Sequence, residues 1–100
     1  MDTWQVVAEP RRRAILALVW DQELSAGEIA GHFDVSFGAI SQHLGVLREA
    51  GFVQMRREGN FRFYAADKKA LGPLRPVLEA MWDDTLTLLA DAVEREARKR

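Results

Sequence analysis

Cysteine is absent from this chain of 100 residues. Without cysteine the protein can form no disulfide, no thiolate metal site, no thiol redox switch and no cysteine nucleophile. A metal site would have to use His32, His43 and carboxylates, and so would lack the thiolate ligands that soft metals prefer. We therefore predict that the protein holds no metal and needs no cofactor.

Long apolar runs are also missing from the sequence. No stretch approaches the roughly 20 apolar residues that a helix needs to cross a bilayer. Residues 1–4 do not begin a basic segment followed by an apolar one, as a secretory signal would. We therefore expect a cytoplasmic protein that makes no contact with a membrane, and the length predicts a single domain over residues 1–100.

The chain carries little net charge, −1 at pH 7, which argues against a general polyanion binder. Its arginines are nevertheless clustered. Residues 11–13 form one cluster, and Arg56, Arg57 and Arg62 form another around Gly59. A local basic footprint of this kind is compatible with DNA binding. Two interpretations of the cluster at residues 11–13 stay open: a solvated run of charge, or a contact with DNA phosphate.

Residues 36–50 are predicted to form one helix with a marked start and end. Ser36 can cap its first turn, and Gly51 suits the left-handed conformation just beyond its end. One face is an apolar stripe, whereas the opposite face is bare and contains two glycines, each costing a helix interior roughly 1 kcal/mol relative to alanine. We interpret this bare face as one that a DNA major groove approaches closely. The stripe consists of Ile40, Leu44 and Leu47, and the bare face of Gly38, Gln42, Gly45 and Glu49.

Three shorter helices are predicted ahead of this one. Residues 4–8 form the first, which ends before Pro10 because proline disfavours helical geometry in the residue before it. Pro10 suits the first turn of the second helix. Ser25 and Glu28 fit a capping box that opens the third. A very short connection then leads to the fourth, so residues 25–50 read as a helix-turn-helix whose second helix commonly enters the major groove.

A β-hairpin, or wing, is predicted over residues 52–65. Aromatic and β-branched residues flank a turn signal at residues 58–60, with partial alternation along both strands. An isolated hairpin is marginal in water, so one of its faces must lean on the helices. We expect the leaning face to contain Val53, Met55, Phe61 and Phe63, and the outward side chains to be Gln54, Arg56 and Arg62, with Arg57 near the tip.

Helical spacing of apolar residues resumes after Pro73 and continues almost to the end of the chain. The apolar stripe is broad, which suggests a second helical partner, and in a small helical protein this is commonly another copy. The alternative is a simple core helix. We predict dimerisation through residues 3–9 and 73–95, with contacts from Trp4, Val7, Leu78, Met81, Trp82, Leu86 and Leu89.

The predicted fold is thus mainly α with a small β-hairpin, in the order of four helices, hairpin and long terminal helix. This order resembles the ArsR/SmtB-type winged helix-turn-helix transcription repressors. Four motifs carry the resemblance. Residues 8–16 are similar to the entry into the family's second helix, 36–47 to its recognition helix, 47–53 to its junction with the wing, and 56–60 to the wing itself.

The resemblance implies a homodimer that binds a short inverted repeat of double-stranded DNA near a promoter and represses transcription. The best-known members release DNA when metal binds to clusters of cysteine, histidine and carboxylate. This chain has no cysteine, and its terminal helix has acidic residues but no histidine. We therefore expect a regulator that does not respond to metal, whose inducer is another small molecule, a partner protein or nothing at all.

If the fourth helix enters the groove, Gln42 is best placed to read a base, because its amide can form two hydrogen bonds with adenine. Phe37 can touch a thymine methyl. For His43 two interpretations stay open, a packed side chain or a phosphate contact. The wing arginines would lie along the backbone or in a minor groove. The predicted DNA-binding residues are Ser36, Phe37, Gly38, Ser41, Gln42, His43, Arg12, Arg56, Arg57, Asn60 and Arg62.

Two other classes of function compete with DNA binding. A winged helix can keep its fold and use the hairpin or the terminal helix to bind another protein, and the low net charge leaves room for this alternative. The sequence offers no nucleophile–base pair, phosphate-cradling loop or carboxylate dyad in a convincing context. We therefore predict no enzyme activity.

Overall fold

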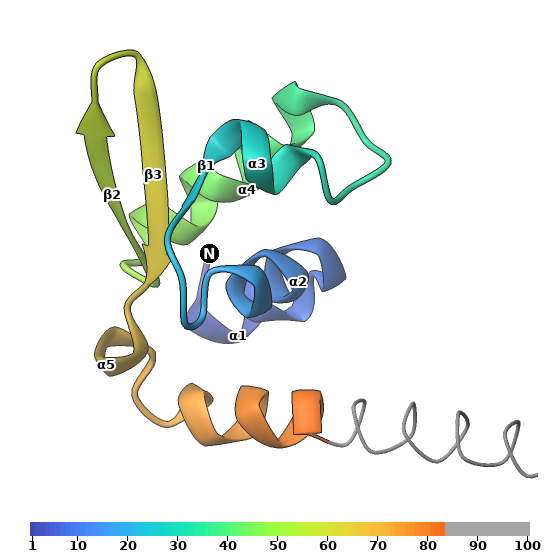
Figure 1. Ribbon diagram of the computed structural model, residues 1–100. Coiled ribbons are helices and arrows are strands. Elements are labelled where there is room, and N and C mark those ends of the chain that lie inside the picture. The colour runs from blue at the N-terminus through green and yellow to red at the C-terminus, as the bar shows by residue number, and fades with distance from the viewer. Residues whose placement is uncertain (84–100) are drawn as a thin grey trace, which may run out of the picture.

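The structure is a computed structural model, and it describes residues 1–83. Helices gather on one side of the molecule, and a β-hairpin stands upright beside them (Figure 1). Residues 74–83 form a further helix that runs below α1 and α2 in this view. The mainly helical fold with a small hairpin is confirmed. The labelled elements are α1 (Thr3–Ala8), α2 (Pro10–Leu18), β1 (Leu24–Ser25), α3 (Ala26–Ala30), α4 (Phe37–Glu49), β2 (Val53–Glu58), β3 (Phe61–Ala66) and α5 (Lys68–Leu71).

The predicted helix starts are present as hydrogen-bonded caps. The capping box of α3 is complete, because the Glu28 amide donates to the Ser25 hydroxyl at 3.1 Å and the Ser25 amide donates to the Glu28 carboxylate at 3.0 Å. The Ser36 hydroxyl accepts from the Ala39 amide at 3.1 Å and so begins α4. Among residues 1–83 no helix is long and apolar enough to span a bilayer.

The end of α4 is fixed by a left-handed glycine, as predicted. Gly51 has a φ of +83°, a conformation that side chains other than glycine rarely adopt. The Phe52 amide then donates to the Leu47 carbonyl at 2.9 Å, which closes a Schellman motif. Phe52 and Leu47 are both buried. The turn therefore leads the chain from α4 directly into β2.

The sheet has three antiparallel strands in the order β1-β3-β2. Two residues of β1 pair with β3, and a strand this short leaves no pattern that the sequence could reveal. In the hairpin Met55 lies opposite Tyr64, and both face the helices, together with Val53. Phe61 and Phe63 point to the other face, so placing them on the leaning face was wrong. The two-residue turn sets this register, and the register places Tyr64 on the face that packs against the helices. Tyr64 is therefore the aromatic residue of β3 that is buried.

The core lies between α2, α4 and the hairpin and extends to the start of the terminal helix. Val7 and Leu78, which we predicted at a dimer interface, are buried within the chain and belong to this core. The reason is that α1 and the helix at residues 74–83 each pack one face against the core of their own chain. Trp82 is half-buried, and its ring meets that of Trp20 edge-on at 4.8 Å between centroids.

The remaining predicted interface residues divide into two groups. Trp4 and Met81 are exposed and do not belong to the buried core. Leu86 and Leu89 lie outside the described residues, so their part of the prediction is not addressed by the structure.

Candidate nucleic-acid interface

The outer face of α4 is exposed. Phe37 is 57% exposed, and Ser41 and Gln42 follow it along the same side. A Cβ placed on Gly45 would meet no atom of residues 1–83 within 4 Å, so packing against these residues does not require glycine there. The prediction that this bare face meets a partner outside the chain stays a prediction.

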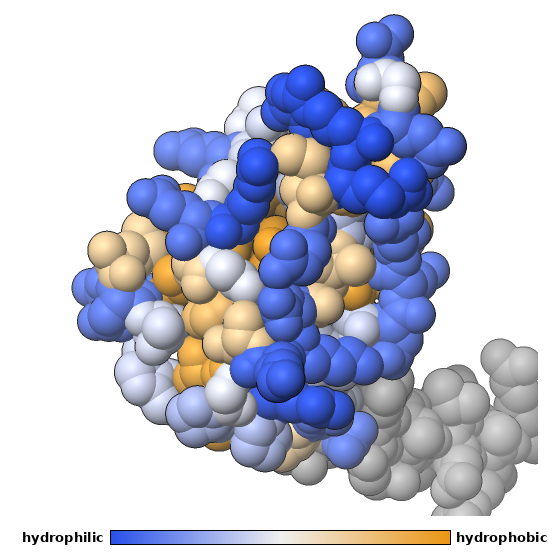
Figure 2. Space-filling model, turned by 90° about the vertical axis from the view of Figure 1, so that its left-hand side faces the viewer, coloured by the Kyte–Doolittle hydropathy of each residue, from blue (hydrophilic) through white to orange (hydrophobic). Residues whose placement is uncertain are grey.

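The tip of the wing is a two-residue turn, Gly59 and Asn60, between Glu58 and Phe61. Gly59 has a φ of +60°, as the first central residue of a type II′ turn requires. This turn matches the twist of the flanking strands and keeps the hairpin narrow to its end. In Figure 2, which views the molecule from the left-hand side of Figure 1, the surface toward the top is largely hydrophilic.

Two arginines of the wing lie directly opposite each other. Arg57 of β2 pairs in register with Arg62 of β3, on the same side of the hairpin as Met55 and Tyr64. Among residues 1–83 neither arginine has an acidic partner. Like charges in this position destabilise a hairpin, so the pair creates a concentrated positive charge that suits an anion from outside.

A groove of about 460 Å³ separates α4 from the wing. Phe37 and Ser41 form part of one wall, and Asn60 and Arg62 form part of the other. The groove brings together predicted site residues that are far apart in the sequence. Phe61 also lines this groove and is exposed. The sequence analysis did not include it in the site, because it predicted Phe61 on the face of the hairpin that packs against the helices.

Arg56 differs from the other two wing arginines. Its Nη2 donates to Glu23 Oε1 at 2.6 Å, and its Nη1 donates to Glu58 Oε2 at 2.6 Å. These hydrogen bonds raise the pKa of Arg56, and the bond from Arg56 holds the pKa of the Glu23 carboxyl below its ordinary value. Its Cζ also lies 4.7 Å from the centre of the Phe63 ring. Arg56 thus makes its contacts within the protein, on the face of the hairpin opposite to Arg57 and Arg62.

Arg12 is turned inward, which corrects its prediction as a phosphate contact. Its side chain crosses to the end of α1, where Nε donates to the Val6 carbonyl at 2.7 Å and Nη2 to the Gln5 carbonyl at 3.1 Å. The residue is only 9% exposed. The physical reason is that α1 ends at Ala8, before Pro10, and its last carbonyls have no hydrogen-bond partner within the helix. Arg12 satisfies them.

His43 belongs to α4, and its side chain points toward the junction of α1 and α2, which fits the packed interpretation. Its side chain is 18% exposed, and Nε2 is 3.5 Å from Glu9 Oε2. Nδ1 is 3.5 Å from Arg12 Nη1. The Glu9 carboxylate also accepts from the amides of Arg11 and Arg12 and so caps α2. These contacts connect the recognition helix to the junction of α1 and α2.

The structure therefore separates the predicted site residues into three places. One group faces outward from the N-terminal half of α4 or lies on the side of the wing that carries Arg62, Arg56 lies on the far face of the wing, and two side chains meet at the junction of α1 and α2. The first group consists of Ser36, Phe37, Gly38, Ser41, Gln42, Arg57, Asn60 and Arg62, and the two side chains at the junction are those of Arg12 and His43.

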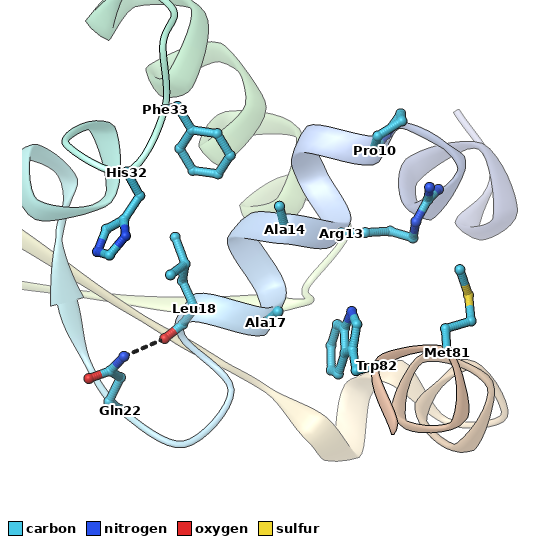
Figure 3. A pocket seen from close by; sticks show the side chains of 10 residues that line it. All are labelled: Pro10, Arg13, Ala14, Ala17, Leu18, Gln22, His32, Phe33, Met81 and Trp82. Carbon is cyan, nitrogen blue, oxygen red and sulfur yellow. Dashed lines mark hydrogen bonds between the residues drawn. The ribbon is translucent and has the colours of Figure 1, made fainter. Parts of the chain in front are cut away.

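A second hollow, of about 650 Å³, lies on another part of the molecule (Figure 3). It is bounded by α2, by residues 32–33 and by the terminal helix, where the Trp82 ring turns toward α2. At its edge Gln22 Nε2 donates to the Leu18 carbonyl at 2.9 Å. The two hollows share no lining residue, so this one is separate from the groove beside the wing.

Comparison with known proteins agrees with this geometry. Residues 9–55 match the family described as "Bacterial regulatory protein, arsR family". The chain is 39% identical to the HTH-type transcriptional regulator Rv2034 of Mycobacterium tuberculosis, over 93% of this chain and 87% of the relative. The chain belongs to the arsR family. The transcriptional repressor SdpR of Bacillus subtilis is 34% identical over 70% of this chain and 78% of its own length.

Solved structures of the family share the fold. The crystal structure of a "possible transcriptional regulator for arsenical resistance" superposes with a TM-score of 0.71 at 42% identity, covering 91% of this chain and 96% of that one. The homodimeric winged helix-turn-helix DNA-binding domain of a Mycobacterium bovis regulator gives a TM-score of 0.68 at 26% identity, covering 80% and 74%. This arsR-family chain is therefore a transcriptional regulator with a DNA-binding winged helix-turn-helix, and not an enzyme.

Proposed function

We propose that this regulator is a homodimeric repressor that binds an inverted-repeat operator and does not respond to metal. The observation that carries the proposal is the groove between α4 and the wing. Arg62 lines this groove and Arg57 lies opposite Arg62 in the hairpin, and neither has an acidic partner among residues 1–83. In this account α4 enters the major groove, and one DNA strand passes between α4 and the hairpin. We place this activity in the cytoplasm, where a bacterial chromosome lies.

The outer face of α4 would read the bases. Gln42 is exposed at the centre of that face, and its amide matches the N6 and N7 edge of adenine in the major groove. Phe37, exposed at the start of the helix, would touch a thymine methyl, and Ser41 a base edge or a phosphate. Gly38 and Gly45 would let the helix axis approach the base pairs closely.

The wing would hold the DNA backbone. A phosphate placed beside Arg57 and Arg62 would relieve their mutual repulsion and gain hydrogen bonds from both guanidinium groups. Asn60 at the tip can donate to a phosphate or to the acceptors on the floor of a minor groove. These contacts position the protein on the duplex, whereas the contacts of α4 specify the sequence.

The dimer and the direction of regulation rest on relatives. A domain of the same fold from Mycobacterium bovis is homodimeric, and the Bacillus subtilis relative SdpR is a repressor. A two-fold dimer presents two α4 helices, so its operator would be an inverted repeat with half-sites about one helical turn, roughly 34–36 Å, apart. Trp4 and Met81 remain the exposed candidates for the dimer contact among residues 1–83.

The independence from metal is proposed from the ligands that the chain offers. The sequence has no cysteine. Among residues 1–83 no three histidine or acidic side chains are grouped so that they would hold a metal ion. An inducer, if the protein has one, would then be another small molecule or a partner protein.

The proposal can be tested by selecting duplexes from a random pool with the wild-type protein and with the Gln42→Ala variant. We expect the wild type to enrich an inverted repeat. The variant should relax the preference at one base position in each half-site, because a bidentate contact contributes about 1–3 kcal/mol of discrimination. Enrichment of no sequence would instead favour the alternative, a winged helix that binds a protein. An unchanged preference in Gln42→Ala would remove Gln42 as a reader.

A further inference from the structure

Phe61 is the exposed residue of the wing that phosphate binding does not explain. It follows the turn directly, and its side chain is 63% exposed. Tyr64, three residues later, occupies the core position of β3. A large aromatic ring at the tip of a hairpin forgoes the stabilisation that burial would give it. Its position therefore suggests a contact outside the chain.

The ring of Phe61 is supported from behind by a connected series of side chains. The Phe63 ring lies 6.3 Å away, tilted by 42°. The Arg56 guanidinium lies over Phe63, with Cζ 4.7 Å from the ring centre. Arg56 in turn is held by carboxylates on two sides, Glu58 in its own strand and Glu23 in the segment before β1. The series crosses the sheet and stiffens the outer face of the wing.

The surroundings of Phe61 match one kind of partner, a nucleic acid groove. Arg57 and Arg62 lie on the opposite side of the hairpin without acidic partners among residues 1–83, and they supply charge for phosphates. Gly59 adds no side chain to the tip, and no atom of residues 1–83 lies within 4 Å of where its Cβ would be. A narrow tip of this kind suits a minor groove about 6 Å wide. Minor-groove proteins frequently insert apolar wedges between base steps there.

We propose that Phe61 is such a wedge, entering the minor groove beside the half-site and partly unstacking one base step. The proposal rests on the proposed function, because the wing must first be held against DNA. The wedge adds specificity without a base hydrogen bond, since flexible pyrimidine–purine steps unstack most easily. In this account Arg56 is a positioning residue for the wedge, which explains why its guanidinium is occupied by Glu23 and Glu58.

The test uses the full-length protein and duplexes that the wild type has selected from a random pool. Energy transfer between dyes at the two duplex ends reports bending, and a fluorescent adenine analogue at steps flanking each half-site reports unstacking. We compare Phe61→Asn with the matched variant Phe61→Leu, which keeps an apolar wedge. Because the side chain is exposed, both variants should keep the wild-type melting temperature.

We expect the wild type to bend the duplex and brighten the analogue at one step. Phe61→Leu should keep most of this signal, whereas Phe61→Asn should lose it and bind roughly tenfold more weakly, with an unchanged salt dependence. Glu23→Gln, which loosens Arg56, should reduce the bend without removing salt-dependent binding.

Two results would overturn the wedge while leaving DNA binding intact. One is a wild-type complex that binds with strong salt dependence but leaves the duplex straight and the analogue dark. The other is a Phe61→Asn variant that bends and unstacks DNA as the wild type does. If the wild type selects no duplex at all, both the wedge and the proposed function are contradicted.

Discussion

Arg57 and Arg62 face each other across the hairpin in register, and no carboxylate among residues 1–83 pairs with either of them. Their neighbour Arg56, one residue away on the opposite face, is bound by two carboxylates. The wing therefore contains two kinds of arginine. One kind builds the hairpin, and the other is left available for a ligand. This division is the reason why we propose that the groove between α4 and the wing binds DNA.

Gly45→Ala should make the protein more stable and a weaker DNA binder. The added Cβ meets no atom of residues 1–83 within 4 Å, so the variant gains helix propensity of about 1 kcal/mol without a clash in this part of the chain. The same methyl group would stand between α4 and the base pairs. Chemical denaturation and a mobility-shift titration measure the two effects. Tighter binding together with higher stability would show that the bare face is not a contact surface.

Arg12→Ala should destabilise the fold, whereas Arg11→Ala should change it little. The first variant removes hydrogen bonds to the carbonyls of Val6 and Gln5 and leaves them unsatisfied, at a cost of roughly 2–4 kcal/mol. Arg11 is exposed, and a surface substitution of this kind typically stays within about 0.5 kcal/mol. Urea unfolding compares the pair. An Arg12→Ala protein of wild-type stability that binds DNA poorly would restore Arg12 as a phosphate contact.

The contact between Glu23 and Arg56 should make stability depend on pH in the acid range. Arg56 lowers the folded-state pKa of Glu23 below its ordinary 4.5. A lowered pKa stabilises the fold above the unfolded value, and this contribution is lost as the pH falls through the folded value. The stability difference between wild type and Glu23→Gln should therefore be constant above about pH 5 and shrink below about pH 4.5.

Unfolding curves collected from pH 6 to pH 3 measure this difference, and Arg56→Gln provides the reciprocal variant. In the Arg56→Gln background the Glu23→Gln substitution should lose its pH dependence, since the hydrogen bond that lowers the pKa is gone. A difference that stays constant across the range in both backgrounds would show that the contact does not form in solution.

Local signals in the sequence were sufficient to predict most of the fold. Ser25 with Glu28, Ser36, Gly51 and Gly59 each act through hydrogen bonds or dihedral angles within a few residues, so their roles follow from the sequence. The positions of Ile40, Leu44 and Leu47 in the core follow from helical spacing in the same way.

The parts that could not be predicted depend on contacts between distant segments. Phe61 and Tyr64 are both aromatic, and only the register of the hairpin decides which of them is buried. Arg12 and Arg56 look like DNA contacts until the structure shows which groups lie beside them, the carbonyls of α1 and the Glu23 carboxylate. Arginine clusters in a sequence indicate charge, but tertiary packing decides which of those charges remain available.

We propose that DNA phosphate lies against Arg57 and Arg62, and the salt dependence of binding to the selected duplex is the sharpest test of this contact. Each phosphate contact contributes about −0.9 to the slope of log K against log salt, so removing two arginines from each subunit of a dimer should make the slope shallower by about 3 to 4. The control is Arg75→Ala, because Arg75 is paired with Glu79 and lies outside the groove. The account predicts a shallower slope for the Arg57→Ala, Arg62→Ala double variant and a wild-type slope for Arg75→Ala. Equal slopes for the double variant and the wild type would contradict it.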